Sequence, residues 1–169
     1  MAITLYDASV PMFRQLLGSL AAILEKASAH AAARGFDASV LLQSRLYPDM
    51  FPLVRQVQIA CDAAKFGVAR VAGVEPPRHD DTEQTVEQLQ ARIAAVLAFV
   101  EGVPRERIDG QEQREVTVPV RDGSLKMSAQ RFLLHRALPN FFFHVTTAYN
   151  ILRHNGVELG KRDYLGKID

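Results

Sequence analysis

Hydrophobic residues recur at three- and four-residue spacing in three long stretches of the chain, which is the period of an amphipathic helix. The stretches cover about residues 9–34, 49–72 and 80–101. Each stretch ends at a glycine: Gly35 after Arg34, Gly73 and Gly102. Glycine readily adopts the left-handed conformation that closes a helix. Each stretch therefore predicts one helix with one buried face.

Start signals precede each of these helices. We expect Asp7 or Ser9 to cap the first helix, with a proline in its first turn, and Asp49 to cap the second ahead of Pro52. Asp80 and Glu83 stand three residues apart, as the partners of a capping box do, and they predict the start of the third helix.

The period then changes from helical spacing to alternation. Val116, Val118 and Val120 alternate with other residues, which is the pattern of a strand. Asp122-Gly123 is a strong hairpin-turn dipeptide. Because Pro119 cannot donate a ladder hydrogen bond, we expect a small edge hairpin here.

A fourth helical region follows from Ser128, the expected cap, and it is apolar around most of its girth up to His154. Pro139 lies in its interior and cannot bond to the carbonyl of His135, so we expect a kink at Leu138-Pro139. Asn155-Gly156 supplies the stop, and the apolar tail of residues 157–166 is expected to fold back. The predicted fold is all-α: one domain, residues 1–169, an antiparallel four-helix bundle with a small β-hairpin before its last, proline-kinked helix.

Composition narrows the function classes. The 169 residues carry a formal charge of +1, which argues against a protein that binds nucleic acid through phosphate contacts. No apolar run is long enough to span a membrane. The single cysteine, Cys61, excludes an internal disulfide and makes a reducing cytoplasm the expected compartment. Its apolar neighbours on the helix indicate an inert core thiol.

His144 is the sharpest candidate for a functional side chain, because it stands in the apolar surface of the last helix. With Asp62, Gln58 and Asn140 it forms our candidate pocket. The favoured interpretation is a buried neutral histidine that bonds to Asp62 or to a backbone carbonyl. A polar ligand pocket is the next alternative. A metal bound by His144 and Asp62 is the third, since catalytic zinc sites usually need three protein ligands.

Other polar residues have simpler interpretations. Arg55, Gln58, Asp62 and Lys65 predict a solvated stripe with an Asp62–Lys65 ion pair. Asn140 is expected to satisfy carbonyls that the kink frees. Three further histidines are taken as structural or solvated, because none is spaced for a helical two-ligand motif: His30, His79 and His135. Nucleotide-binding, nucleophile-elbow and paired-cysteine motifs are absent, so no reaction class is favoured and enzyme status stays open.

Two blocks of the sequence resemble the signature of an uncharacterised bacterial family with no assigned function. The second-helix block is Arg45-Leu46-Tyr47-Pro48-Asp49-Met50, with Gln56-Val57 and Asp62-Ala63-Ala64-Lys65. The C-terminal block is Leu138-Pro139-Asn140-Phe141-Phe142-Phe143-His144, with Thr147-Ala148-Tyr149, Ile151-Leu152-Arg153-His154-Asn155-Gly156-Val157 and Leu159-Gly160-Lys161. The family is similar to the DinB/YfiT-like superfamily of four-helix bundles.

The resemblance implies a divalent metal, such as zinc or nickel, on three histidines in many members, which are metal-dependent hydrolases, thiol-dependent transferases or proteins of unknown activity. The corresponding positions here fall near Gln58, Phe141 and His144, so only one histidine matches. We therefore expect no metal or cofactor. The expected protein is a non-enzymatic homodimer, paired through the last helix near Phe141, Phe142 and Phe143, that binds a small ligand near His144. The alternative is a metal-dependent hydrolase or thiol-dependent transferase.

Overall fold

The computed structural model describes residues 2–167 as a mostly helical protein with one two-stranded antiparallel sheet. Its four long helices are α1 (Val10–Arg34), α3 (Leu53–Ala72), α4 (Val86–Gly102) and α6 (Leu138–His154). The shorter elements are α2 (Ser39–Leu42), the 3₁₀ turn η1 (Arg105–Arg107), β1 (Glu115–Val120), β2 (Gly123–Ser128), α5 (Ala129–Phe132), the π-helical turn η2 (Leu133–Ala137) and α7 (Lys161–Leu165). No described helix is long and apolar enough to cross a bilayer.

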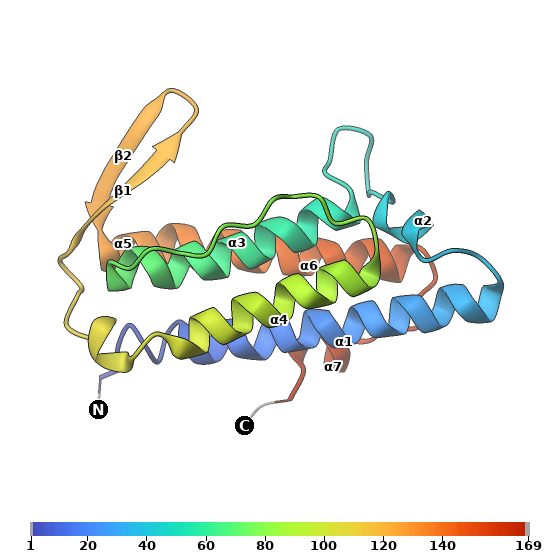
Figure 1. The fold of residues 1–169 in the computed structure, drawn as a ribbon, viewed down its shortest axis with the longest axis horizontal. Coiled ribbons are helices and arrows are strands. Elements are labelled where there is room, and N and C mark those ends of the chain that lie inside the picture. Colours follow the sequence, from blue (N-terminus) through green and yellow to red (C-terminus); the bar gives the residue numbers. More distant parts are fainter. Residues whose placement is uncertain (1, 168–169) are drawn as a thin grey trace.

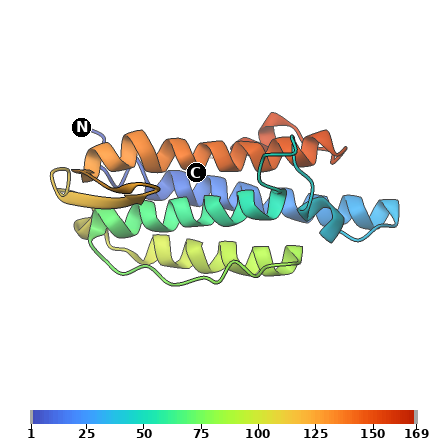
Figure 2. The same cartoon turned by 90° about the horizontal axis from the view of Figure 1, so that it is seen from above.

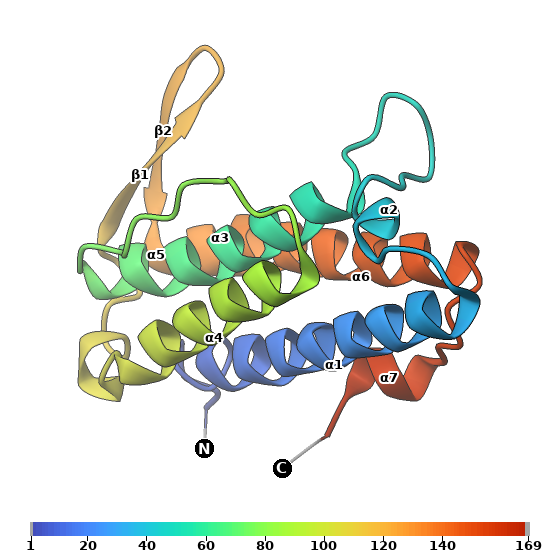
Figure 3. The same ribbon diagram turned by 45° about the vertical axis from the view of Figure 1, so that its right-hand side comes forward.

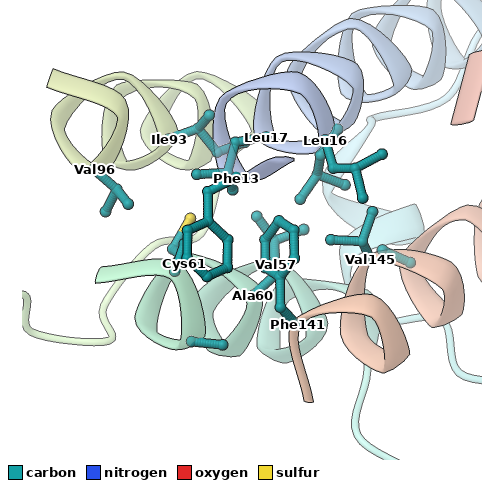
Figure 4. Packing of buried hydrophobic residues seen from close by; sticks show 14 of the residues in the cluster. Phe13, Leu16, Leu17, Val57, Ala60, Cys61, Ile93, Val96, Phe141 and Val145 are labelled. Atoms are coloured by element: carbon teal, nitrogen blue, oxygen red, sulfur yellow. The ribbon is translucent and has the colours of Figure 1, made fainter. Parts of the chain in front are cut away.

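The long helices lie side by side around one hydrophobic core (Figures 1 and 2). The predicted stops at Gly35 and Gly73 are confirmed, with both residues in the left-handed conformation after α1 and α3. Gly102 is not such a stop, because it is the last residue of α4 and extended Val103 follows it. Figure 4 shows α1, α3, α4 and α6 all contributing to the core, where the rings of Phe13 and Phe141 meet edge to face at 4.9 Å. Gly67 lets these helices approach closely, because a Cβ there would lie 2.9 Å from the Phe13 ring.

The helix directions correct part of the predicted arrangement. Helices α3 and α4 run in the same direction, because the connecting residues 73–85 return along the length of α3 before α4 begins (Figures 1 and 2). An extended segment of that length reaches about 40 Å, which is more than the roughly 30 Å of a twenty-residue helix. A long connector therefore permits the parallel pair, whereas short connectors would have enforced antiparallel neighbours.

The side-chain caps predicted for the first three long helices are wrong. Helix α1 begins after Ser9, but the Ser9 hydroxyl donates to the Leu5 carbonyl and does not cap the helix. Helix α4 begins later than expected, with Thr85 and Gln88 forming the capping box, because Glu83 bonds to Arg92 instead. Helix α3 has no side-chain cap, and Asp49 lies outside it. Ser128 caps α5 as predicted, by accepting from the Arg131 N–H.

The hairpin forms where the alternation predicts it, and Val116 and Val118 are buried. Its register pairs Val120 with Gly123, so the connecting loop is Arg121-Asp122 and not Asp122-Gly123. The hairpin rises from the end of the molecule where α3 ends and α5 begins (Figure 3).

Pro139 is accommodated by a π-helical turn and not by a break. Through η2 the helix widens, and the Leu138 N–H bonds to the Leu133 carbonyl five residues back. The extra residue in this turn makes room for the ring of Pro139, which would otherwise clash with the carbonyl four residues before it. At the predicted kink, the π-helical turn thus joins α5 and α6 into a continuous helical path from Ala129 to His154.

The C-terminal tail folds back as predicted. Helix α7 packs on α1, where the Ser19 hydroxyl donates to the carbonyls of Asp163 and Tyr164, and Lys26 pairs with Asp163 at 2.7 Å.

Candidate functional site

The four residues of the candidate pocket do not meet at one place in the structure. His144 lies in the core on α6, Gln58 and Asp62 belong to a charged cluster between α3 and α4, and Asn140 is exposed on α6. Only Asp62 and Asn140 line the same cleft.

His144 bonds to Gln56 and not to Asp62, which corrects the favoured interpretation of its partner. The His144 Nδ1 lies 2.7 Å from the Gln56 Oε1, and the Gln56 Nε2 donates to the Phe51 carbonyl at 3.0 Å. Because the amide oxygen must accept, Nδ1 carries the proton. Burial, with Arg55 nearby, lowers the pKa of His144 to about 4, so the ring is neutral at pH 7. Gln56 lies two residues before Gln58, the amide that the family resemblance pointed to. Its place in the Gln56-Val57 block was the only signal for it.

Gln58 and Asp62 belong instead to what we call the Arg92 cluster: Arg55, Gln58, Asp62, Lys65, Asp81, Glu83 and Arg92. The buried guanidinium of Arg92 contacts Asp62 at 2.9 Å, Asp81 at 2.8 Å and Glu83 at 3.0 Å. The predicted Asp62–Lys65 pair is confirmed at 2.9 Å. The expected solvated stripe is wrong, however, because Gln58 and Lys65 are buried under the connector 73–85, which supplies Asp81 and Glu83.

The cluster is balanced, with the cations Arg55, Lys65 and Arg92 facing three carboxylates. It holds the connector against α3 and α4. His79, also on the connector, lies 3.1 Å from the Lys65 ammonium through its Nδ1, and burial and that ammonium lower its pKa. The Arg92 Nε is the one buried side-chain nitrogen or oxygen in residues 2–167 without a hydrogen-bond partner.

A cleft of about 530 Å³ opens on the other side of Asp62, between α3, β1 and the start of α6. We call it the η2 cleft, because the π-helical turn contributes His135, Arg136 and Ala137 to its wall. The remaining lining residues are Ile59, Asp62, Ala63, Phe66, Arg70, Val118, Pro119, Phe132, Pro139 and Asn140. The role expected for Asn140 at the kink has no counterpart among the hydrogen bonds of the described residues, and its side chain lines the cleft.

Arg70 is held in this cleft by aromatic rings. Its Cζ lies 4.8 Å from the centre of the Phe66 ring and 5.5 Å from that of Phe132. Partial burial and the charge of Arg136 lower the pKa of Arg70. Neither Arg70 nor Arg136 stands out in the sequence, because it is the π-helical turn that places η2 beside the C-terminal half of α3.

The residues present do not fit the metal site that the resemblance implies. His144 bonds to an amide, and Asp62 is engaged by Arg92 and Lys65. Within residues 2–167 no three histidine, cysteine, aspartate or glutamate side chains are grouped so that they could hold a metal ion. Cys61 is fully buried, which raises the pKa of its thiol to about 12 and agrees with the inert core position predicted.

A family model described as "Domain of unknown function (DUF1993)" matches residues 5–165. The chain belongs to the DUF1993 family. The fold of this DUF1993 chain is similar to the crystal structure of a DinB family member protein from Shewanella denitrificans, with a TM-score of 0.91. The two sequences are 47% identical, and the match covers 97% of this chain and 93% of that chain. Both resemblances inferred from the sequence, to an unassigned family and to DinB-like proteins, are therefore confirmed. Among proteins with curated descriptions, none matches the chain.

Proposed function

We propose that this DUF1993 protein is a metal-free, non-catalytic helical bundle that binds a small molecule in the η2 cleft. The observation that carries the proposal is the π-helical turn, which brings His135 and Arg136 of η2 beside Arg70 of α3 in one open cleft. π-helical turns are rare in proteins overall, and those that occur often lie at functional sites. The cleft has the size of a small-molecule site, and its wall combines apolar side chains with the polar groups of Asp62, Arg70, His135, Arg136 and Asn140.

The proposal moves the ligand away from His144. That ring is buried, neutral and bonded to Gln56, and it does not line the η2 cleft. Asp62 and Asn140 stay in the proposed site because they line the cleft, whereas Gln58 belongs to the Arg92 cluster. We also propose that residues 1–169 form one domain and that this domain is a four-helix bundle. Its four long helices and their shared hydrophobic core support this proposal.

The test is a heteronuclear NMR titration of the labelled protein with a fragment set that contains acids, bases and neutral compounds. We expect some fragments to shift the amide signals of Phe66, Val118 and Ala137, which line the cleft from three elements. Shifts confined to residues near His144, or no shift with any fragment at millimolar concentration, would contradict a binding function of the cleft.

Metal analysis separates this proposal from the metal-dependent hydrolase or transferase. Protein purified without a histidine tag or chelator should hold well under one equivalent of zinc, nickel or manganese. Stoichiometric metal that disappears in His144→Ala and stays in His135→Ala would establish the alternative.

The homodimer and the cytoplasmic location also stay proposals. Of the three consecutive aromatic residues, Phe141 is buried against Phe13 of the same chain, so it cannot belong to a dimer contact. Phe142 is partly buried, and Phe143 is 55% exposed. Light scattering at micromolar concentration should give a dimer mass that Phe143→Ser lowers. An unchanged dimer mass would move the interface elsewhere, and a monomer mass for the parent protein would end the dimer proposal.

A further inference from the structure

The η2 cleft concentrates positive charge that nothing in the described protein neutralises. Neither Arg70 nor Arg136 has an ion pair or a side-chain hydrogen bond with any of residues 2–167, although each lines the cleft. Placing two guanidinium groups together is unfavourable, and the effect of Arg136 on the pKa of Arg70 reflects this repulsion. An anion between them would remove it.

The one carboxylate of the cleft does not supply that anion. The Asp62 Oδ1 already contacts both Arg92 and Lys65 at 2.9 Å, within a cluster whose charges balance. Asp62 also lies eight residues before Arg70 on α3, which places the two about 12 Å apart along the helix axis. Neither Arg70 nor Arg136 forms an ion pair with Asp62 among residues 2–167.

The guanidinium of Arg70 also has a defined position in the cleft, over two aromatic rings. Its contacts with the faces of Phe66 and Phe132 hold the group, while its N–H donors have no partner among the described residues. A planar fork of N–H donors fits a carboxylate through two parallel hydrogen bonds. The rest of the wall is largely apolar, with Ile59, Val118 and Pro139 among the lining residues.

We infer that the η2 cleft binds a small organic anion, a carboxylate with an apolar body, whose charged group lies between Arg70 and Arg136. This inference rests on the proposed function and adds the chemical class of the ligand. The apolar body lies against the hydrophobic wall, and His135 and Asn140 offer further polar contacts at the rim.

The experiment compares benzoate with benzamide, which has nearly the same shape without the charge. Both are titrated into the labelled protein at low ionic strength and followed by the amide signals of Val118 and Ala137. We expect benzoate to bind at least tenfold more tightly than benzamide. Arg70→Gln and Arg136→Gln should each weaken benzoate at least tenfold and leave benzamide unchanged, because a charge-assisted pair is lost.

Arg153→Gln is the matched control, since Arg153 is exposed in the last turn of α6 and does not line the cleft. It should leave both affinities unchanged. Circular dichroism and thermal unfolding of each variant check that the fold is kept.

The other outcomes overturn the inference in distinguishable ways. Equal binding of the two probes, with no effect of Arg70→Gln, would overturn the anion specificity while the cleft remained a binding site. Weakening by Arg153→Gln equal to that by Arg70→Gln would show nonspecific attraction and overturn it too. If benzoate fails to bind while neutral fragments shift the amide signals of the cleft, only the inference is overturned. If no fragment shifts these signals, the proposed function is overturned as well.

Discussion

The Arg92 cluster and the η2 cleft lie on either side of Asp62, and they treat positive charge in opposite ways. In the cluster, three cations face three carboxylates, and the central guanidinium is buried. In the cleft, Arg70 and Arg136 line an open space, and the one carboxylate there, Asp62, is engaged by Arg92 and Lys65. A balanced, closed set of charges holds the structure together, whereas an unbalanced, open set is available to a ligand.

Replacing the central cation of the cluster should have the largest effect on stability. Arg92→Met leaves three carboxylates around a buried apolar side chain, and breaking a buried ion pair costs about 3 kcal/mol. Urea unfolding should show this loss, and hydrogen exchange should show faster opening of the connector 79–83. The matched variant is Arg70→Met in the cleft, for which we expect a change below about 1 kcal/mol. Similar losses for both variants would remove the distinction between the two regions.

Acidification should lower the free energy of unfolding through His144, which belongs neither to the Arg92 cluster nor to the η2 cleft. Its folded-state pKa of about 4 lies below the value of about 6.5 expected in the unfolded chain. The unfolded state therefore binds the proton first, so the stabilising contribution is present above pH 6.5 and is lost as the pH falls towards 4. We expect a loss of roughly 2 kcal/mol by pH 5, measured by urea unfolding at a series of pH values.

His144→Gln provides the control, because its amide can still bond to Gln56 but does not titrate. The pH dependence between 6.5 and 5 should become shallower. His79, whose pKa is also lowered, contributes in the same direction, so His79→Gln should account for part of the remaining slope. An unchanged slope in His144→Gln would show that the ring titrates normally.

The smallest expected effect concerns the repulsion between Arg70 and Arg136. Raising sodium chloride from about 50 to 500 mM screens this repulsion and should stabilise the parent protein by a few tenths of a kcal/mol relative to Arg70→Gln. The difference is measured by thermal unfolding of both proteins side by side. A larger salt response in Arg70→Gln would mean that the arginine has a favourable partner in the cleft.

Local patterns in the sequence determined most of the elements of this protein. Helix ends at Gly35 and Gly73, the strands around Val116 and Val118, and the cap at Ser128 all follow from interactions within a few residues. The burial of Cys61 and His144 likewise follows from the apolar faces on which they stand. Such features depend on period and backbone chemistry, which a sequence displays directly.

Only the tertiary structure decided the partners of the polar residues. Asp62 and Gln58 were expected near His144, yet the connector 73–85 folds back along α3 and brings Asp81 and Glu83 to them. Gln56 takes the place beside His144, and the π-helical turn places Arg136 in the same cleft as Arg70. These contacts depend on helix direction and on one extra residue in a helical turn, and neither leaves a periodic trace in the sequence.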